Sequence, residues 1–265
     1  MIYSGSLRSL PTEREEMLSS DNQQGRLDPK GVQQFCGEVA RTCQPIVNSL
    51  MEQEWGVDRQ WLQRLRRADA DHRADLPWVV LEGDNGVGKD TLAARLEGDG
   101  WRVLNRTPQA MEALTAARNA PASQRTSAYM QLNRCCALLA SLSDDPCLLV
   151  RYWPSTLNAA FVTGLIDEPG MRQVAGLLAH ACSMPDLVLR LDATQEERAR
   201  RIHHRGPVGG KLDDVSLEKD TACRFCLALV SEFFPDWEDL DTTGRSPAKV
   251  HRLALELLHR HRLTP

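Results

Sequence analysis

The sequence lacks long apolar runs, internal repeats, low-complexity tracts and an excess of basic charge. A helix needs about 20 consecutive apolar residues to span a bilayer, and residues 13–16 are charged where a signal peptide would have an apolar core. We therefore expect a cytoplasmic protein without a membrane partner. The net charge of −4 argues against a mainly electrostatic nucleic-acid binder, so no nucleic-acid partner is expected. Eight cysteines in 265 residues lack the density of a disulfide scaffold, which favours reduced thiols.

The patterns that are present divide the chain into two parts. Residues 1–27 are polar and show no sustained periodicity, which indicates a mobile tail. Apolar residues then recur at helical spacing over residues 28–56, and a second, shorter helix is expected from Asp58. We predict an N-terminal tail and helical extension over residues 1–76, followed by an α/β domain over residues 77–265.

Short apolar segments alternate with helical patterns throughout the second part. The five segments expected to be strands are residues 78–81, 101–105, 147–152, 187–192 and 236–241. Alternation of strands and helices indicates a parallel sheet with helices on both faces. Ligands of such sheets gather at the carboxyl ends of the strands.

A Gly-rich turn that ends in a lysine follows the first expected strand. The spacing Gly83-x4-Gly88-Lys89 matches a phosphate-binding loop, in which backbone N–H groups face phosphate oxygens. A tight turn alone would explain the glycines, but a helix dipole disfavours a cation at the start of a helix unless an anion is present. The next residues are Asp90, where Ser or Thr is usual, and Thr91. A carboxylate beside a triphosphate is repelled unless a metal lies between them. Asp90 or Thr91 is therefore the expected Mg²⁺ contact. Alternatively, Asp90 is a simple carboxylate in the first turn of the helix, without a role at a metal.

Five collinear segments resemble the thymidylate kinase family of nucleoside monophosphate kinases, over roughly residues 77–262. These segments are Glu82-Gly83, residues 104–108, residues 150–152, residues 185–206 and residues 241–250. The longest is similar to the family's P-D-L-V-x-x-L-D-x-x-x-E-x-x-x-x-R pattern followed by R-G. The resemblance implies the P-loop kinase fold, ATP and Mg²⁺ as cofactors and, because thymidylate kinases are commonly dimers, a homodimer.

The resemblance also implies which residues bind the donor and the acceptor. The donor would be bound by Gly83, Asp84, Asn85, Gly86, Val87, Gly88, Lys89, Asp90, Thr91 and Arg245. The acceptor would be bound by Arg106, Met130, Arg134, Arg151, Ser155 and Asn158. Arg106 and Arg151 would bind the acceptor's phosphate through their guanidinium groups. Arg134 would contact the acceptor's base. Met130 stands at the position where the family usually has a phenylalanine that stacks on this base. The alternative for each of these three arginines is a solvated surface side chain.

The basic segment after the fourth expected strand resembles the mobile lid of these kinases. Residues 194–205 are expected to form a helix, and the lid would cover about residues 203–218. Lid closure would bring cations to the transferred phosphoryl group and exclude water, with Arg201, Arg205 and Lys211 as candidates. Most of the charged residues in this segment are expected to lie on a solvated helix face. The catalytic set implied by the resemblance is Lys89, Arg151, Glu82, Arg201 and Arg205.

The chain departs from the family pattern in its acidic residues. Asn85 stands where the family has an aspartate before the loop, and Val150 replaces the aspartate of its D-R-Y segment. Two alanines at 159–160 replace a Tyr-Gln pair near the base. Glu82 and Asp90 are then the closest acidic residues for a metal, and a glutamate corresponding to Glu82 looks like the base of the related deoxynucleoside kinases.

Three hypotheses follow. The leading one is Mg²⁺-dependent transfer of the γ-phosphoryl group of ATP, in line, to a nucleoside monophosphate, either a pyrimidine deoxynucleotide or a specialised analogue. The runner-up is a kinase of nucleosides or other small hydroxyl compounds that uses Glu82 as its base. The third is a catalytically weak nucleotide-binding protein that contacts a partner through residues 1–76.

Overall fold

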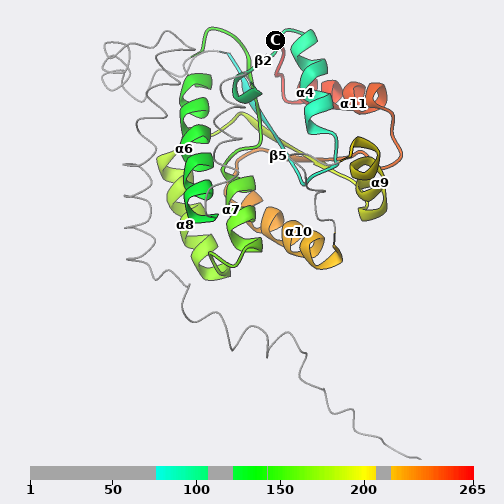
Figure 1. Cartoon of the computed structure of the whole chain (residues 1–265). Coiled ribbons are helices and arrows are strands. Elements are labelled where there is room, and N and C mark those ends of the chain that lie inside the picture. Colours follow the sequence, from blue (N-terminus) through cyan, green and yellow to red (C-terminus); the bar gives the residue numbers. More distant parts are fainter. Residues whose placement is uncertain (1–75, 107–121, 142, 207–215) are drawn as a thin grey trace, which may run out of the picture.

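Five strands pair in parallel into one sheet (Figure 1). The computed structural model describes residues 76–106, 122–141, 143–206 and 216–265. The strands are β1 (Trp78–Glu82), β2 (Arg102–Val103), β3 (Cys147–Val150), β4 (Leu187–Asp192) and β5 (Trp237–Asp241), in the order β2-β3-β1-β4-β5. The predicted five-stranded parallel sheet is confirmed. Because β1 lies between β3 and β4, the carboxyl ends of these three strands meet around the residues that follow Glu82.

Two expected strands end earlier than the sequence pattern indicates. The segment 101–105 contains only the two residues of β2, because the chain turns into a short 3₁₀ helix, η1 (Leu104–Arg106). The segment 147–152 stops at Val150, because Arg151 adopts a left-handed backbone conformation with φ of 72°. Both turns lie at the carboxyl edge of the sheet.

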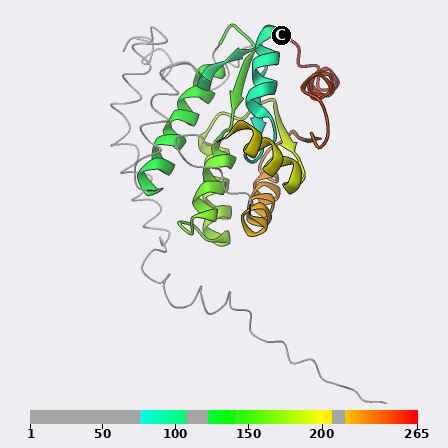
Figure 2. The same cartoon turned by 45° about the vertical axis from the view of Figure 1, so that its right-hand side comes forward.

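Helices cover both faces of the sheet, as expected (Figures 1 and 2). They are α4 (Lys89–Gly98), α6 (Ala122–Ala140), α7 (Trp153–Val162), α8 (Glu168–Ala181), α9 (Gln195–Arg205), α10 (Leu217–Ser231) and α11 (Pro247–Arg260). Alternate residues of β1 point to opposite faces. Val79 and Leu81 pack with α4 and α11, whereas Trp78 and Val80 pack with α6, α7, α8 and α10.

Short polar side chains set the start of four helices. Asp167, Thr194, Ser216 and Ser246 each accept a hydrogen bond from the backbone three residues later, at the starts of α8, α9, α10 and α11. Tyr152, in the corresponding position of α7, gives no such side-chain bond. The start of α7 therefore depends on a group from another element.

Several expectations lie outside the described residues. These are the tail and extension up to residue 75, residues 207–215 of the expected lid, and Lys211 within them. The division into an extension and a kinase domain, the homodimer and the cytoplasmic location stay predictions. In the part of the chain that the structure describes, no helix has both the length and the apolar character that a membrane crossing requires.

Candidate active site

The Gly-rich loop connects the end of β1 to the start of α4 and lies close to β4. A Cβ atom on Gly83 would lie 2.2 Å from the carbonyl oxygen of Leu191, so only glycine fits there. Gly88, the N-cap of α4, has φ of 99°, a conformation that side chains other than glycine rarely adopt. The glycines thus allow a tight loop that leads directly into a helix N-terminus, where an anion is stabilised.

Lys89 lies buried under this loop, with 4% of its surface exposed. Its Nζ donates to the carbonyl oxygens of Gly83 at 2.8 Å and of Asp84 at 2.6 Å. Burial, followed by the neighbouring charge of Arg151, lowers the pKa of Lys89 well below its ordinary value. Neutral carbonyl oxygens thus bind the ammonium group of Lys89, and burial raises the free energy of its charged form.

Arg151 approaches the same point from the end of β3. Its Nη1 donates to Gly83 O at 3.3 Å and to Ser155 Oγ at 3.2 Å, and its Nη2 donates to Asn85 Oδ1 at 2.5 Å. The left-handed backbone of Arg151 is strained for a residue with a Cβ atom, and such strain concentrates at functional sites. Gly83 O therefore accepts from two cations, Lys89 and Arg151.

Asn105 of η1 fixes the backbone of this arginine. Its Nδ2 donates to Val150 O at 2.8 Å, and its Oδ1 accepts from Val150 N at 2.9 Å. The side chain is buried and also reaches Arg151 O at 3.4 Å. The role of Asn105 was not predicted, although an asparagine at the end of an apolar segment is a signal for such a contact. Arg106, the next residue, ends η1 at the carboxyl edge of the sheet.

Glu82 supplies the missing cap of α7. Its carboxylate is fully buried and accepts from Tyr152 N at 2.7 Å, Ser155 Oγ at 2.5 Å, Ser155 N at 3.4 Å and Gly83 N at 3.4 Å. Burial raises the pKa of Glu82, and the bonds from Ser155 and Tyr152 oppose that rise. Glu82 thus ties the end of β1 to the start of α7, next to Arg151.

The expected metal contacts differ in how well they fit a cation. Asp90 and Thr91 lie exposed in the first turn of α4, beside Lys89. Glu82 is buried, and both its oxygens already accept hydrogen bonds from protein groups. An exposed carboxylate next to the loop suits Mg²⁺, which keeps several waters. Glu82 is therefore the least suited of the three to a metal, and metal binding by Asp90 and Thr91 stays a prediction.

Arg201, on the helix expected to lead into the lid, reaches the loop. Arg201 Nη1 donates to Gly86 O at 3.3 Å and to Thr242 Oγ1 at 3.0 Å, and its Nη2 donates to Thr242 O at 2.6 Å. Arg205 lies exposed in the last turn of the same helix. Arg201, Ser155 and Asn85 thus join Lys89 and Arg151 around the loop.

The remaining predicted residues make no hydrogen bond to the loop among the contacts described here by residue. Met130 packs against the core on the α6 side, and Arg134 lies exposed on α6. Asn158 donates to Cys223 Sγ at 3.0 Å, and Arg245 binds Asp241 at 3.3 Å. For Met130, Arg134, Asn158 and Arg245, a role in binding stays a prediction.

Known proteins resemble this chain in fold. No protein-family profile and no curated protein matches its sequence. A thymidylate kinase from Candida albicans matches 71% of this chain and 92% of its own length, with 16% identity and a TM-score of 0.52. This chain therefore has the thymidylate kinase fold. A deoxyadenosine kinase from M. mycoides matches 69% of the chain and 99% of its own length, with 13% identity and a TM-score of 0.48.

Within this thymidylate kinase fold, a buried arginine also reaches the loop. Most of residues 198–205 were expected to form a solvated basic face, and Arg200, with 69% of its side chain exposed, fits that expectation. Arg198 does not, because it is buried and contacts Asp84, Asn85 and Asp220. Its position four residues before the buried Ile202, on one face of α9, is the signal that was available in the sequence.

Proposed function

We propose that the protein is a Mg²⁺-dependent kinase that transfers the γ-phosphoryl group of ATP to the phosphate of a nucleoside monophosphate. The acceptor would be a pyrimidine deoxynucleotide or a specialised analogue of one. The observation that carries the proposal is the shared contact at Gly83 O, which accepts from Lys89 Nζ at 2.8 Å and from Arg151 Nη1 at 3.3 Å. Two cations that reach one point from two strand ends suit two adjacent anions.

The charges of the neighbouring arginines support a phosphate as the acceptor. Arg198 and Arg224 are each paired with two carboxylates. The recorded hydrogen bonds of Lys89 and Arg151, in contrast, all go to neutral oxygens within the described residues. Two cations whose hydrogen bonds go to neutral oxygens suit a phosphate better than an uncharged alcohol.

Catalysis would consist of positioning and charge neutralisation. Lys89 would hold the transferred phosphoryl group, and Arg151 would hold the acceptor's phosphate in line with it. Arg201 would add positive charge from the side of Gly86. Mg²⁺, held by Asp90 and Thr91, would neutralise charge on the donor's phosphates. Glu82 would keep α7 and the Arg151 turn in place.

One observation supports the runner-up function, a kinase of nucleosides or other small hydroxyl compounds. Glu82 has a raised pKa and lies beside Arg151, as a base for an acceptor hydroxyl would. To act as that base, however, it would have to release at least one of its hydrogen bonds, such as that from Ser155 Oγ.

An acceptor panel tests the two functions against each other. With Mg²⁺ and ATP, we expect nucleoside diphosphates from the monophosphates, with kcat/KM at least about 100-fold above that for the matching nucleosides. Product formation is measured by mass spectrometry, and the Lys89→Met variant is the control for contaminating kinases. Phosphorylation of nucleosides without turnover of monophosphates would refute the proposal and support the hydroxyl kinase.

Nucleotide binding is expected to be accompanied by the uptake of a proton by Lys89. The free protein lowers the pKa of Lys89, and the phosphates of a bound nucleotide should raise it again. Between these two pKa values the complex holds more protons than the free protein, so affinity falls as pH rises through the lowered pKa. Calorimetry in buffers of different ionisation enthalpy measures the uptake. Lys89→Met should abolish it, and uptake that persists in that variant would assign the proton to another group.

A further inference from the structure

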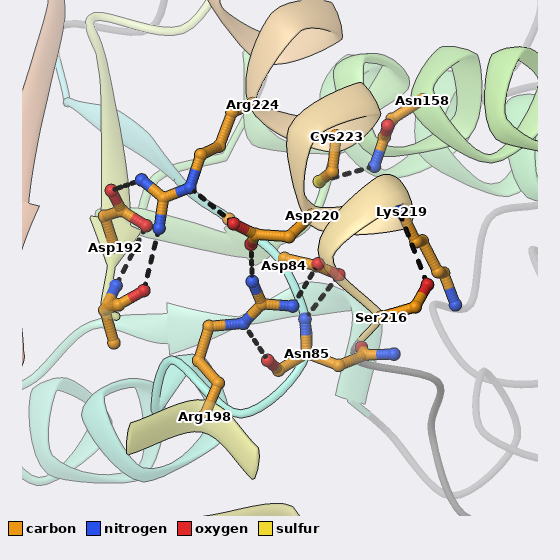
Figure 3. A network of polar contacts seen from close by, with 12 residues as sticks. Asp84, Asn85, Asn158, Asp192, Arg198, Ser216, Lys219, Asp220, Cys223 and Arg224 are labelled. Atoms are coloured by element: carbon orange, nitrogen blue, oxygen red, sulfur yellow. Dashed lines mark hydrogen bonds and ion pairs between the residues drawn. The ribbon is translucent and has the colours of Figure 1, made fainter. Parts of the chain in front are cut away.

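Arg198 of α9 is an arginine buried at the phosphate-binding loop. Its Nε donates to Asn85 O at 2.9 Å, and its two terminal nitrogens bind the carboxylates of Asp84 and Asp220 (Figure 3). Only 1% of the Arg198 surface is exposed. A buried guanidinium is tolerated when acceptors surround its fork. Arg198 is thus held between the loop and α10.

Asp220 is shared with a second arginine. Arg224 Nε donates to Asp220 at 2.9 Å, and its terminal nitrogens donate to Asp192 at 2.5 Å and to Ala193 O at 2.9 Å. The side chains form a row of alternating charge from the loop to the end of β4 (Figure 3). At the loop end of this row, Asp84 pairs with Arg198.

Asp84 is a carboxylate inside a loop that would bind phosphates. Its backbone oxygen accepts from Lys89 Nζ at 2.6 Å, so the residue lies beside the cation that would hold the transferred group. An uncompensated carboxylate there would repel a triphosphate, and the repulsion is strong where water is excluded. Pairing with Arg198 places a positive charge directly beside this carboxylate.

Asn85 links Arg198 to the acceptor side. Its backbone oxygen accepts from Arg198, while its side-chain Oδ1 accepts from Arg151 Nη2 at 2.5 Å. Both bonds involve the same residue. The contact with Arg198 therefore fixes the backbone of the residue that orients Arg151.

We propose that Arg198 is a positioning residue for phosphoryl transfer, which neutralises Asp84 within the loop and holds Asn85 against Arg151. The proposal rests on the kinase function proposed above. It differs from a purely structural role, in which Arg198 only joins α9 to α10. A structural role affects stability and leaves the nucleotide affinity of the folded protein unchanged.

Four proteins separate the two roles: the wild type, Arg198→Met, Asp84→Asn and the double variant. Arg198→Met is expected to weaken Mg²⁺·ATP binding about 30-fold, because an unpaired Asp84 then faces the phosphates. Removal of that carboxylate should restore affinity, so the double variant is expected to bind ATP within about threefold of Asp84→Asn. Calorimetry measures each Kd. A double variant as weak as Arg198→Met would overturn the proposal.

The Asp84→Asn single variant and one further variant, Arg200→Met, guard the test against misfolding. Asp84→Asn alone keeps Arg198 and removes the carboxylate, so it should bind ATP at least as tightly as the wild type, and weaker binding would contradict the proposal. Arg200→Met is the matched control, because Arg200 lies exposed on the same helix and pairs with Glu197. It should leave the Kd for ATP and the KM of the acceptor unchanged. Arg198→Met should raise the KM of the acceptor as well, since Arg151 loses its orientation.

Hydrogen exchange distinguishes failure of this proposal from failure of the proposed function. If the wild type binds no ATP, the kinase function is refuted, yet the contact of Arg198 with the loop is still measurable in the unliganded protein. Exchange over residues 83–89 is expected to become faster in Arg198→Met and to stay unchanged in Arg200→Met. Equal exchange in the wild type and Arg198→Met would overturn the positioning role.

Discussion

Replacement of Lys89 by methionine is expected to lower kcat/KM for phosphoryl transfer by about a thousandfold or more. The variant removes the only side-chain cation that donates to both Gly83 O and Asp84 O within the described residues. Methionine fills similar space without a charge. The transferred phosphoryl group would then lose the contact that stabilises it between donor and acceptor. A coupled assay of ADP release measures the change.

The stability of this variant follows from the lowered pKa of Lys89. A lysine whose pKa is lowered by the fold binds fewer protons when folded than when unfolded, so its protonated form costs stability below the lowered pKa. That cost disappears as the pH rises from the lowered pKa towards the ordinary value of 10.5. Lys89→Met is therefore expected to unfold at or above the wild-type temperature at neutral pH, which thermal melts can check.

Lys249→Met is the control for this prediction. Lys249 lies exposed in the first turn of α11, and its loss should leave both activity and melting temperature unchanged. If Lys89→Met kept more than about a tenth of wild-type activity, Lys89 would not be the residue that holds the transferred phosphoryl group.

The loop, the five strands and most helix starts are predictable from the sequence because their signals are local. Gly83, Gly88 and Lys89 lie within seven consecutive positions, and caps such as Thr194 act on a backbone group three residues away. Strand ends are less predictable, because they depend on neighbours. Val150 ends β3 where Asn105, 45 residues earlier in the chain, binds its backbone.

The contacts of the residues that position the site cannot be predicted from local sequence patterns. Glu82 caps a helix 70 residues away, and Arg198 binds the loop 113 residues before it. Sequence periodicity reports which face of a helix is apolar, and it interprets a charged residue as solvated unless its partners are known. For this reason the sequence predicted Glu82 to be a base or a metal contact and did not predict a role for Arg198.

The structure explains why the acidic residues of this chain differ in position from those of the family pattern. Where the family pattern has an aspartate, Asn85 offers a neutral oxygen to Arg151. Val150 is buried in the apolar cluster on the α4 side, where a carboxylate would lack solvation. The carboxylate in the loop is instead Asp84, one position earlier, and it is paired with Arg198 rather than with Arg151. The hydrogen bonds of Arg151 therefore go to neutral oxygens, as the proposed contact with an acceptor's phosphate requires.

Loss of the Arg151 guanidinium is expected to lower kcat/KM for the acceptor by about a thousandfold, with less than about a fivefold change in the KM of ATP. Arg151→Ala and Arg151→Gly form a matched pair, because both remove the fork and differ only in the Cβ atom. The native φ of 72° favours glycine, so Arg151→Gly should be more stable than Arg151→Ala by about 1 kcal/mol in denaturant unfolding. If the two variants lose activity equally but differ in stability in this way, the activity depends on the guanidinium group and not on the stability of the fold. An Arg151→Gly variant with near-wild-type acceptor kinetics would remove Arg151 from the acceptor site.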